Sequence, residues 1–310
     1  MYLSAVVPIY NEEGAIKNLH KKIVNVLEKI NKPFEIIFVN DGSADRTLEI
    51  MKKLKPLTII NFRKNFGQTA AMDAGIKQAK GKYIIIMDGD GQNDPEDIPK
   101  LIEKLKLDGM DVLSGWRKNR KDHFLKKFSS KCAAVLRRIL INDGIHDSGC
   151  SLKIYKRECF KRVDLYGEMH RFIPAILKIK GFKIGEVEIS HNPRITGKTK
   201  YNWKRGVKGI LDIFAVWFWK KYSNRPLHFF GGLGILLMLV SVISGAWAIY
   251  KKIFSNIDLS DTSLTILSMG GFFMGILFFI FGLLADILSK IYYSSSKDMP
   301  YNIKDIINND

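Results

Sequence analysis

The sequence predicts an α/β protein with a mostly parallel sheet, followed by amphipathic interface helices and two transmembrane helices. In the first third of the chain, short apolar and β-branched runs alternate with amphipathic segments through short connections. This alternation is typical of a parallel sheet with right-handed crossovers. Farther along, two apolar runs are each long enough to cross a hydrocarbon core of ~30 Å.

Four apolar runs are expected to be strands, because each is short, rich in β-branched residues and followed by polar turn residues. They cover residues 3–9, 34–39, 57–62 and a run that begins at Ile84. The segments between them are expected to be helices over residues 15–30, 45–54 and 68–79. In the first of these, apolar residues recur at three- and four-residue steps, which lays one helix face on a sheet. Ser43 is expected to cap the second helix.

The fourth run ends abruptly in the polar segment Asp88-Gly89-Asp90-Gly91-Gln92. Ligands of open α/β sheets bind at the carboxyl ends of strands, so both carboxylates are expected where a substrate would lie. Mg²⁺ and Mn²⁺ prefer such oxygen ligands and often join them to substrate phosphates. An ordinary Asp-Gly turn accounts for this segment alone equally well.

Other polar residues also follow strand ends. Asp41 follows the second strand and Arg63 the third, so one cleft can gather acids for a metal and bases for phosphates. The chain contains neither GxGxxG nor GxxxxGK[ST], which excludes an ordinary dinucleotide or P-loop site. The histidines show no metal-ligand spacing.

The formal net charge of +18 predicts an anionic partner: a nucleic acid, an anionic membrane surface or a phosphorylated substrate. The three cysteines, Cys132, Cys150 and Cys159, have no CxxC spacing and leave one thiol over. This pattern argues against both a zinc site and a disulfide framework.

The two long apolar runs, residues 229–250 and 264–285, predict transmembrane helices. Basic and aromatic residues precede them, and these predict an amphipathic interface helix at about 123–140 and a juxtamembrane helix at 205–226. Taken alone, the first of these also fits a solvated helix packed on the sheet. The expected organisation is a sheet domain at 1–204, the juxtamembrane helix, a membrane part at 227–292 and a tail at 293–310.

Charge around the first span predicts the orientation of the chain. Lys220, Lys221 and Arg225 precede the span, so the N-terminal domain and, after two spans, both termini are expected in the cytoplasm. Lys251 and Lys252 in the connecting loop oppose this orientation. The residues after Met1 lack the pattern of a secretory signal, which supports it. A multi-pass protein of the cell membrane is expected.

Six motifs occur in order along the chain: VVPIYNEE, VNDGS, RKNFGQTAA, MDGDGQNDPEDIP, SGCSLK and RITGKTKY, followed by the two spans. With these motifs the chain resembles family 2 glycosyltransferases of the polyprenyl-phosphate (dolichyl- or undecaprenyl-phosphate) hexosyltransferase group over nearly its whole length. The resemblance implies a GT-A (Rossmann-like) fold. It also implies inverting transfer of a hexose from a UDP- or GDP-sugar to a membrane polyprenyl phosphate, with Mg²⁺ or Mn²⁺ as cofactor.

Carried over by position, the resemblance also assigns roles to individual residues. Asp90 and Arg117 are the implied catalytic residues. The implied donor-nucleotide residues are Pro8, Tyr10, Glu12, Asp41 and Asp88; the metal residues are Asp88, Asp90 and Gln92; and the acceptor-phosphate residues are Arg117, Ser148 and Lys200.

The chain departs from many members of this group at two positions. Asn40 stands where an Asp often precedes the nucleotide-binding Asp, and Lys153 stands where an Arg is frequent. The first change is expected to preserve donor binding, and the second bears on acceptor contacts. A lipid phosphate is already an anion near neutral pH, so it needs positioning more than a strong general base.

Other function classes fit part of the sequence. A processive polysaccharide synthase shares the fold and donor site, but the chain lacks a QxxRW motif and has few spans. A membrane-bound glycosyltransferase that makes a glycolipid and a catalytically inactive membrane scaffold are the remaining alternatives. A nucleic-acid-binding protein explains the charge but not the carboxylates, so no nucleic-acid partner is expected. The formation of a homo-oligomer is left open.

Overall fold

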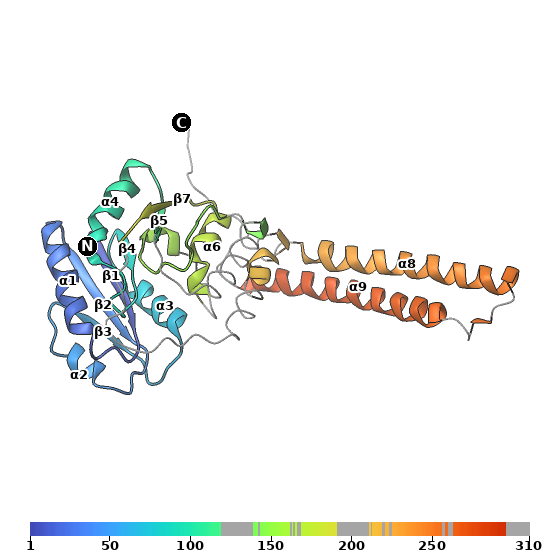
Figure 1. Ribbon diagram of the computed structural model, residues 1–310, viewed down its shortest axis with the longest axis horizontal. Coiled ribbons are helices and arrows are strands. Elements are labelled where there is room, and N and C mark those ends of the chain that lie inside the picture. Colours follow the sequence, from blue (N-terminus) through green and yellow to red (C-terminus); the bar gives the residue numbers. More distant parts are fainter. Residues whose placement is uncertain are drawn as a thin grey trace. The chain divides into compact units, whose positions relative to one another are not determined.

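A computed structural model of the protein describes residues 1–118, 139–141, 143–161, 163, 165, 169–190, 211, 213–218, 221–222, 225–255, 258–259 and 263–295 (Figure 1). The chain divides into two compact units, Met1–Trp217 and Phe218–Asp310. Each unit is described by itself.

The first unit is built on a seven-stranded sheet with the strand order β3-β2-β1-β4-β6-β5-β7. Only β6 runs antiparallel to its neighbours, β4 and β5, while the other described pairs are parallel. This confirms the predicted mostly parallel sheet. The strands are β1 (Leu3–Ile9), β2 (Phe34–Asn40), β3 (Thr58–Asn61), β4 (Tyr83–Ile86), β5 (Val112–Trp116), β6 (Lys153–Lys156) and β7 (Ile184–Glu188).

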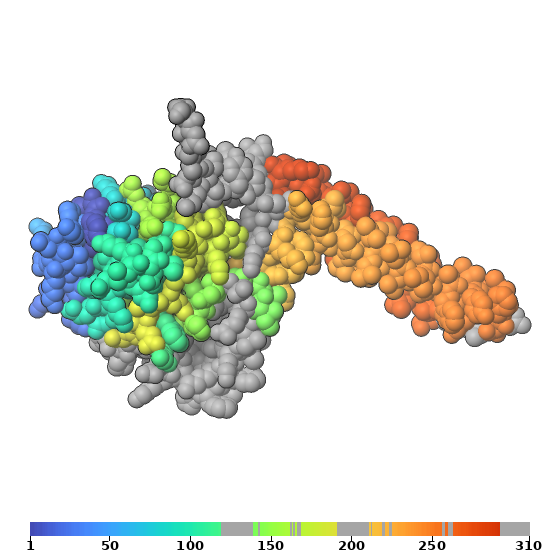
Figure 2. Space-filling view, turned by 90° about the horizontal axis from the view of Figure 1, so that it is seen from above, coloured from blue at the N-terminus to red at the C-terminus, as the bar shows by residue number. Residues whose placement is uncertain are grey.

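Helices cover both faces of this sheet, which is why its central strands are apolar on both sides. One core cluster joins the sheet to α1 and α4, and a second joins the opposite face to α3 and α6. In Figure 2 the segments of this unit, coloured from blue to yellow-green, pack closely against one another. The helices are α1 (Ile16–Lys29), α2 (Thr47–Met51), α3 (Gln68–Gln78), η1 (Pro95–Asp97), α4 (Ile98–Leu107), η2 (Arg157–Phe160), η3 (Met169–Arg171) and α6 (Ile173–Ile179).

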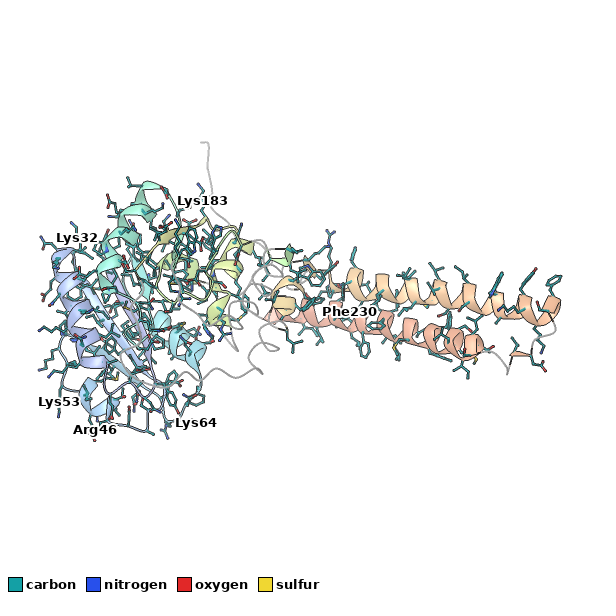
Figure 3. All side chains as sticks on the ribbon, viewed as in Figure 1. Lys32, Arg46, Lys53, Lys64, Lys183 and Phe230 are labelled. Atoms are coloured by element: carbon teal, nitrogen blue, oxygen red, sulfur yellow. The ribbon has the colours of Figure 1, made fainter. Side chains whose placement is uncertain are left out.

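Charged side chains lie on the outside of the same unit. Figure 3 labels five exposed cations there, on helices and loops well separated in sequence: Lys32, Arg46, Lys53, Lys64 and Lys183. These five cations lie on solvated surface, where no desolvation opposes their charge.

The second helix differs from its prediction. It is shorter than residues 45–54, and Ser43 is not its cap, so that expectation was wrong. The Thr47 backbone N–H instead donates to the Asp45 carboxylate at 3.0 Å, because Asp45 lies two residues away in the geometry of an Asx turn. The Ser43 hydroxyl accepts a hydrogen bond from the backbone N–H of Asn11 at 3.0 Å.

The second unit contains two long apolar helices, α8 (Pro226–Ser255) and α9 (Ser263–Ser295), each long enough to cross a membrane. Small residues of α8, among them Gly231 and Gly234, are buried against α9. Three α9 glycines face α8, whereas a Cβ on Gly270 would meet nothing within 4 Å. These three are Gly271, Gly275 and Gly282.

Two predicted segments lie partly outside the described residues. Of the interface helix at 123–140, only residues 139 and 140 are described, and both are helical. Of the juxtamembrane helix, residues 211, 213–218 and 221–222 are described as helical, and Ile213 and Val216 pack with Phe172 and Ala175. The domain limits drawn from the sequence stay a prediction.

Candidate active site at the carboxyl edge of the sheet

Four of the predicted site residues follow strands that end at the same edge of the sheet. Asp41 follows β2, Asp88 and Asp90 follow β4, and Arg117 follows β5. Strands β4 and β5 point the same way because both are antiparallel to β6, which lies between them. The topology therefore brings acids and a base from distant parts of the chain to one edge, as expected for an open α/β sheet.

The two acids after β4 sit in different environments. The Asp88 carboxylate accepts a hydrogen bond from Nε2 of Gln68, at the start of α3, at 2.7 Å. The Asp90 carboxylate is buried and accepts the backbone N–H of Gln92 at 3.1 Å. Burial, followed by the nearby charge of Asp90, raises the pKa of Asp88. The two carboxylates repel each other, so a bound cation would stabilise both of them.

The glycine between these acids allows a close approach to β1. A Cβ on Gly89 would lie 2.6 Å from Cδ1 of Ile9 and 3.1 Å from the carbonyl oxygen of Pro8. A larger residue would push the acidic loop away from the end of β1. The predicted donor residue Pro8 thus lies directly beside the predicted metal loop.

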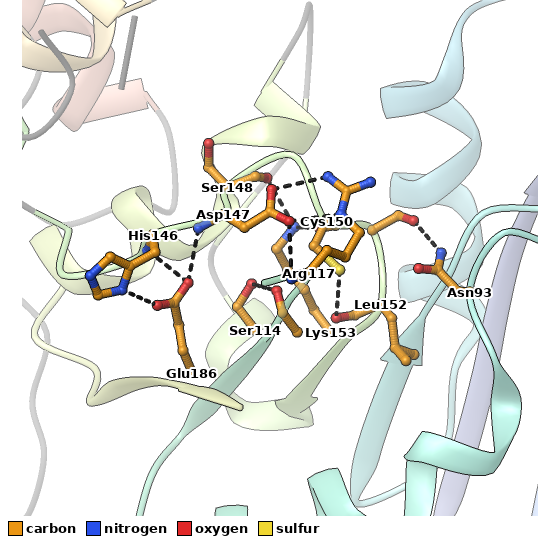
Figure 4. Close-up of polar contacts among 12 residues, drawn as sticks. Asn93, Ser114, Arg117, His146, Asp147, Ser148, Cys150, Leu152, Lys153 and Glu186 are labelled. Carbon is orange, nitrogen blue, oxygen red and sulfur yellow. Dashed lines mark hydrogen bonds and ion pairs between the residues drawn. The ribbon is translucent and has the colours of Figure 1, made fainter. Parts of the chain in front are cut away.

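Arg117 is clamped by Asp147 (Figure 4). Its Nε lies 2.7 Å from Oδ2 of Asp147 and its Nη2 lies 3.0 Å from Oδ1, while its backbone N–H donates to Oδ2 at 3.3 Å. Both side chains are mostly buried, with exposed fractions of 10% and 14%. Burial opposes the charge of Arg117, but the Asp147 hydrogen bonds outweigh it and raise the pKa of the guanidinium. Arg117 is a permanent, oriented cation at this edge.

Lys153, the first residue of β6, is a second buried cation. Its Nζ donates to the carbonyl oxygens of Ser148 and Cys150. Burial lowers the pKa of this ammonium group, while the charges of Asp147 and Asp88 oppose the shift. Lys153 therefore ties the Ser148–Cys150 loop to the sheet and places positive charge near Asp88.

A cavity of about 170 Å³ opens between these residues. Asp88 and Gln68 line one part of it, and Ser148 and Lys153 line another. It is also lined by His170 from η3, whose Nδ1 lies 2.8 Å from Oγ1 of Thr69. The lining is predominantly polar, which suits a phosphorylated or hydroxylated ligand better than an apolar one.

Three of the predicted donor residues, Tyr10, Glu12 and Asp41, lie where the loops after β1 and β2 are joined. Asn11 exchanges hydrogen bonds with the second loop: its Oδ1 accepts the Ala44 N–H at 2.8 Å, and its own N–H donates to Ser43. The Glu12 N–H donates to Oγ1 of Thr47 at 3.0 Å. Tyr10 lies in the first of these loops with 39% of its surface exposed. Its ring is therefore accessible to a ligand.

The Asp41 carboxylate already accepts hydrogen bonds within the protein, which the sequence did not indicate. This buried carboxylate accepts the backbone N–H groups of Phe66 at 2.7 Å and Gly67 at 3.0 Å. It thereby holds the basic loop after β3 against the end of β2. Ionised carboxylates have about four acceptor sites, so acceptor capacity remains for a ligand.

The structure describes two of the remaining predicted residues but not the third. Gln92 lies in the acidic loop, and Ser148 lines the cavity. Lys200 lies outside the described residues. Sequence reasoning missed Asp147, Gln68 and His170. Gln68 lies within the motif RKNFGQTAA, and Asp147 directly precedes the motif SGCSLK, so nearness to these motifs was the available signal.

Comparisons with known proteins identify the family of this chain. The model of the family described as glycosyl transferase family 2 matches residues 4–164. A dodecaprenyl-phosphate galacturonate synthase of Rhizobium johnstonii is 39% identical, over 98% of this chain and 92% of its own length. An undecaprenyl-phosphate 4-deoxy-4-formamido-L-arabinose transferase of Pectobacterium carotovorum is 29% identical, over 94% of this chain and 89% of its own.

Solved structures show the same fold. Glucosyl-3-phosphoglycerate synthase from Mycobacterium tuberculosis, in complex with Mn²⁺ and UDP-glucose, matches with a TM-score of 0.55 and 15% identity. The match covers 71% of this chain and 78% of that one. At this identity the likeness concerns the fold, which is the predicted GT-A fold. Since the family model spans more than half of the chain and the Rhizobium relative is similar over almost all of it, the protein belongs to glycosyl transferase family 2 and is a glycosyltransferase.

Proposed function

We propose that this glycosyltransferase moves a hexose from a UDP- or GDP-sugar to a polyprenyl phosphate in the membrane, with inversion and with the help of a divalent metal. The observation that carries the proposal is the meeting of Asp88 and Asp90 with the buried cations Arg117 and Lys153 at one sheet edge. The two named relatives, each similar along most of its length, act on dodecaprenyl and undecaprenyl phosphate by name, which supports this acceptor class.

The residues present fit Mg²⁺ or Mn²⁺. Asp88 and Asp90 offer hard oxygen ligands, and burial together with the nearby charge of Asp90 raises the pKa of Asp88, so a bound cation would stabilise its ionised form. Within the part of the chain that the structure describes, no third His, Cys, Asp or Glu joins them. That arrangement suits a cation held by two carboxylates and completed by the donor diphosphate. Such a cation would neutralise charge on the departing diphosphate.

The joined loops after β1 and β2 are proposed to hold the nucleotide. Pro8, Tyr10, Glu12 and Asp41 keep the donor-binding roles that the resemblance implies, and Asp88 faces the donor from β4. Tyr10 offers an exposed ring for a base to stack on, and Asp41 retains acceptor sites beside the 66–67 amides. Asn40 donates to Oδ1 of Asn61 at 2.7 Å, so this departure from the family pattern is satisfied within the sheet.

The phosphate of the acceptor is proposed to lie against Arg117 and Ser148, with Lys200 contributing from the segment that leads to the membrane. Asp147 takes the Nε side of the guanidinium, and no contact within the described residues uses Nη1. An arginine has five N–H donors in a planar fork, so its outer edge can bind a phosphate in two places. Held in this way, a phosphate oxygen can attack the sugar without a general base.

The chain is proposed to cross the cell membrane twice through α8 and α9, with the sheet domain and both termini in the cytoplasm. Both helices carry apolar side chains over most of their surface. Lys252, which opposes this orientation, lies 3.9 Å from Asp258, so its charge is partly compensated.

A direct assay tests the proposed function. Membranes containing the protein are incubated with labelled UDP- and GDP-sugars and with undecaprenyl or dolichyl phosphate, with Mn²⁺ or Mg²⁺ and then with excess chelator. We expect one nucleotide sugar to give a labelled, chloroform-soluble product that disappears with chelator. Failure of every donor, together with failure of UDP and GDP to bind in the presence of Mn²⁺, would favour the inactive scaffold.

A further inference from the structure

Glu186 lies on the edge strand β7, opposite Ser114 of β5, the strand that ends just before Arg117. An acid on an edge strand is ordinarily solvated, but the side chain of Glu186 is only 9% exposed. Nothing in the catalytic scheme above uses it. Its burial therefore indicates that Glu186 contributes to the surrounding structure.

The Glu186 carboxylate holds two successive residues of the loop that precedes β6 (Figure 4). Its Oε1 accepts the backbone N–H of His146 at 2.7 Å and that of Asp147 at 3.1 Å. Its Oε2 lies 2.8 Å from Nδ1 of His146, whose ring stacks on Trp116 at 4.8 Å between centroids. Three contacts from one carboxylate fix both the position and the direction of the backbone at 146–147.

The second of these residues is the one that clamps Arg117. Both Asp147 oxygens are committed to the guanidinium and to the Arg117 backbone N–H. The orientation of Arg117 therefore depends on where the Asp147 backbone lies, and Glu186 determines that position. The chain of contacts runs from the edge strand, through the loop, to the cation proposed to bind phosphate.

We propose that Glu186 is a positioning residue, which aims the free edge of the Arg117 guanidinium at the acceptor phosphate by anchoring Asp147. This inference rests on the proposed function, because it concerns the phosphate role of Arg117. A misplacement of about 1 Å at a positioning group is enough to slow a reaction on the order of a hundredfold. Glu186 acts at a distance and does not touch the substrate.

The chain offers a matched control on the same strand. Glu188 is two residues along, so its side chain leaves the same face, and its carboxylate pairs with Lys118 at 2.7 Å. That ion pair is about half exposed, with side-chain fractions of 50% and 59%. Loss of an exposed pair of this kind has little consequence for stability.

The test is kinetic and uses the full-length protein, the nucleotide sugar and the polyprenyl phosphate that the wild type accepts. We expect Glu186→Ala to lower kcat/KM for the lipid phosphate about tenfold or more, while KM for the nucleotide sugar stays within about twofold. Glu188→Ala should match the wild type. Glu186→Gln keeps a carbonyl oxygen for both backbone N–H groups, so it should recover most of the activity.

A double substitution distinguishes positioning from general damage. If Glu186 acts through Arg117, Glu186→Ala should cause no further loss in an Arg117→Ala background. Losses that multiply, a nucleotide-sugar KM that rises in step, or an effect no greater than that of Glu188→Ala would each overturn the proposal.

Should Glu186→Ala fail to fold, Glu186→Gln takes its place in the cycle. Its loss of about two- to fivefold should vanish when Arg117 is absent, and a loss that persists would refute the assignment. A wild-type protein that transfers no sugar overturns the proposed function instead. That result is separate because it precedes any variant.

Discussion

Gly234 on α8 and Gly275 on α9 meet backbone to backbone. A Cβ on Gly234 would lie 2.6 Å from the Gly275 carbonyl oxygen, and a Cβ on Gly275 would lie 2.7 Å from the Gly234 carbonyl oxygen. Membrane helices associate through such close packing, because lipid supplies no hydrophobic drive between them.

Gly275→Ala should therefore force the two helices apart. We expect a loss of about 1–3 kcal/mol in stability, the usual cost of overpacking, seen as a lower Tm in detergent. Gly270→Ala is the control, because a Cβ there meets nothing within 4 Å. Equal Tm values for the two variants would show that α8 and α9 do not cross at this point.

Asp88→Asn and Asp90→Asn should each reduce sugar transfer by at least about a hundredfold, since each removes charge from the proposed metal site. The Asp88 variant should keep or raise its Tm in metal-free buffer, because burial and the charge of Asp90 disfavour the ionised Asp88 carboxylate. Activity that survives excess chelator in the wild type would contradict this account.

Lys200 should matter more than its neighbour Lys198. If Lys200 grips the acceptor phosphate, Lys200→Ala removes a charge-assisted hydrogen bond worth about 1.5–3 kcal/mol, or about ten- to a hundredfold in kcat/KM for the lipid phosphate. Nucleotide-sugar binding should hardly change. Small, equal effects of both substitutions that anionic lipid reverses would identify the segment as a general membrane-surface anchor.

The buried thiols should resist alkylation at neutral pH. Burial raises the pKa of Cys150 to about 11 and that of Cys159 to about 12. A thiol with a pKa raised to about 11 is ionised in only about one molecule in a thousand at pH 8, and the thiolate is the reactive form. In a Cys132→Ser variant, maleimide should label the native protein hardly at all at pH 8 and the denatured protein twice. Stoichiometric native labelling at pH 8 would show that these thiols are not enclosed.

Orientation in the membrane is open to direct labelling. Cysteines introduced at Asp258, in the connection between α8 and α9, and at Asp310, in the C-terminal tail, should react from opposite sides of sealed vesicles. Labelling of Asp310 should come from the side that also exposes the sheet domain. Reaction of both positions from one side would refute two crossings.

The periodicity of apolar residues predicted the central strands and α1 closely, because these elements are buried and their pattern is set by burial alone. Strand β6 gave no such signal: it is four residues long and has Lys153 and Lys156 at its ends. Lys153 is nonetheless buried, since backbone carbonyls receive its ammonium group. A pattern of residue types cannot show that a lysine has found such partners.

The candidate site also contains residues that the sequence could place and residues that it could not. Asp88 and Asp90 follow a strand directly, so local order was enough to place them together. Arg117 and Asp147 come from separate loops, after β5 and before β6, and their pairing depends on these two strands lying side by side. His170 reaches the cavity through η3, a single turn of helix whose position depends on contacts such as that with Thr69. The positions of these residues depend on packing between segments far apart in the chain, and a single sequence does not show that packing.

Hydrogen bonds of Asn11, Glu12 and Thr47 join the loops after β1 and β2, so each loop depends on the other for its conformation. Recombination between two relatives that exchanged one loop alone would separate residues that hydrogen-bond to each other in this chain. If these loops hold the donor, the segment from the end of β1 to the start of α2 should be inherited as one unit together with the donor preference. Lineages that acquired a new sugar would be expected to have replaced both loops in a single event or through a neutral intermediate in which these hydrogen bonds persist.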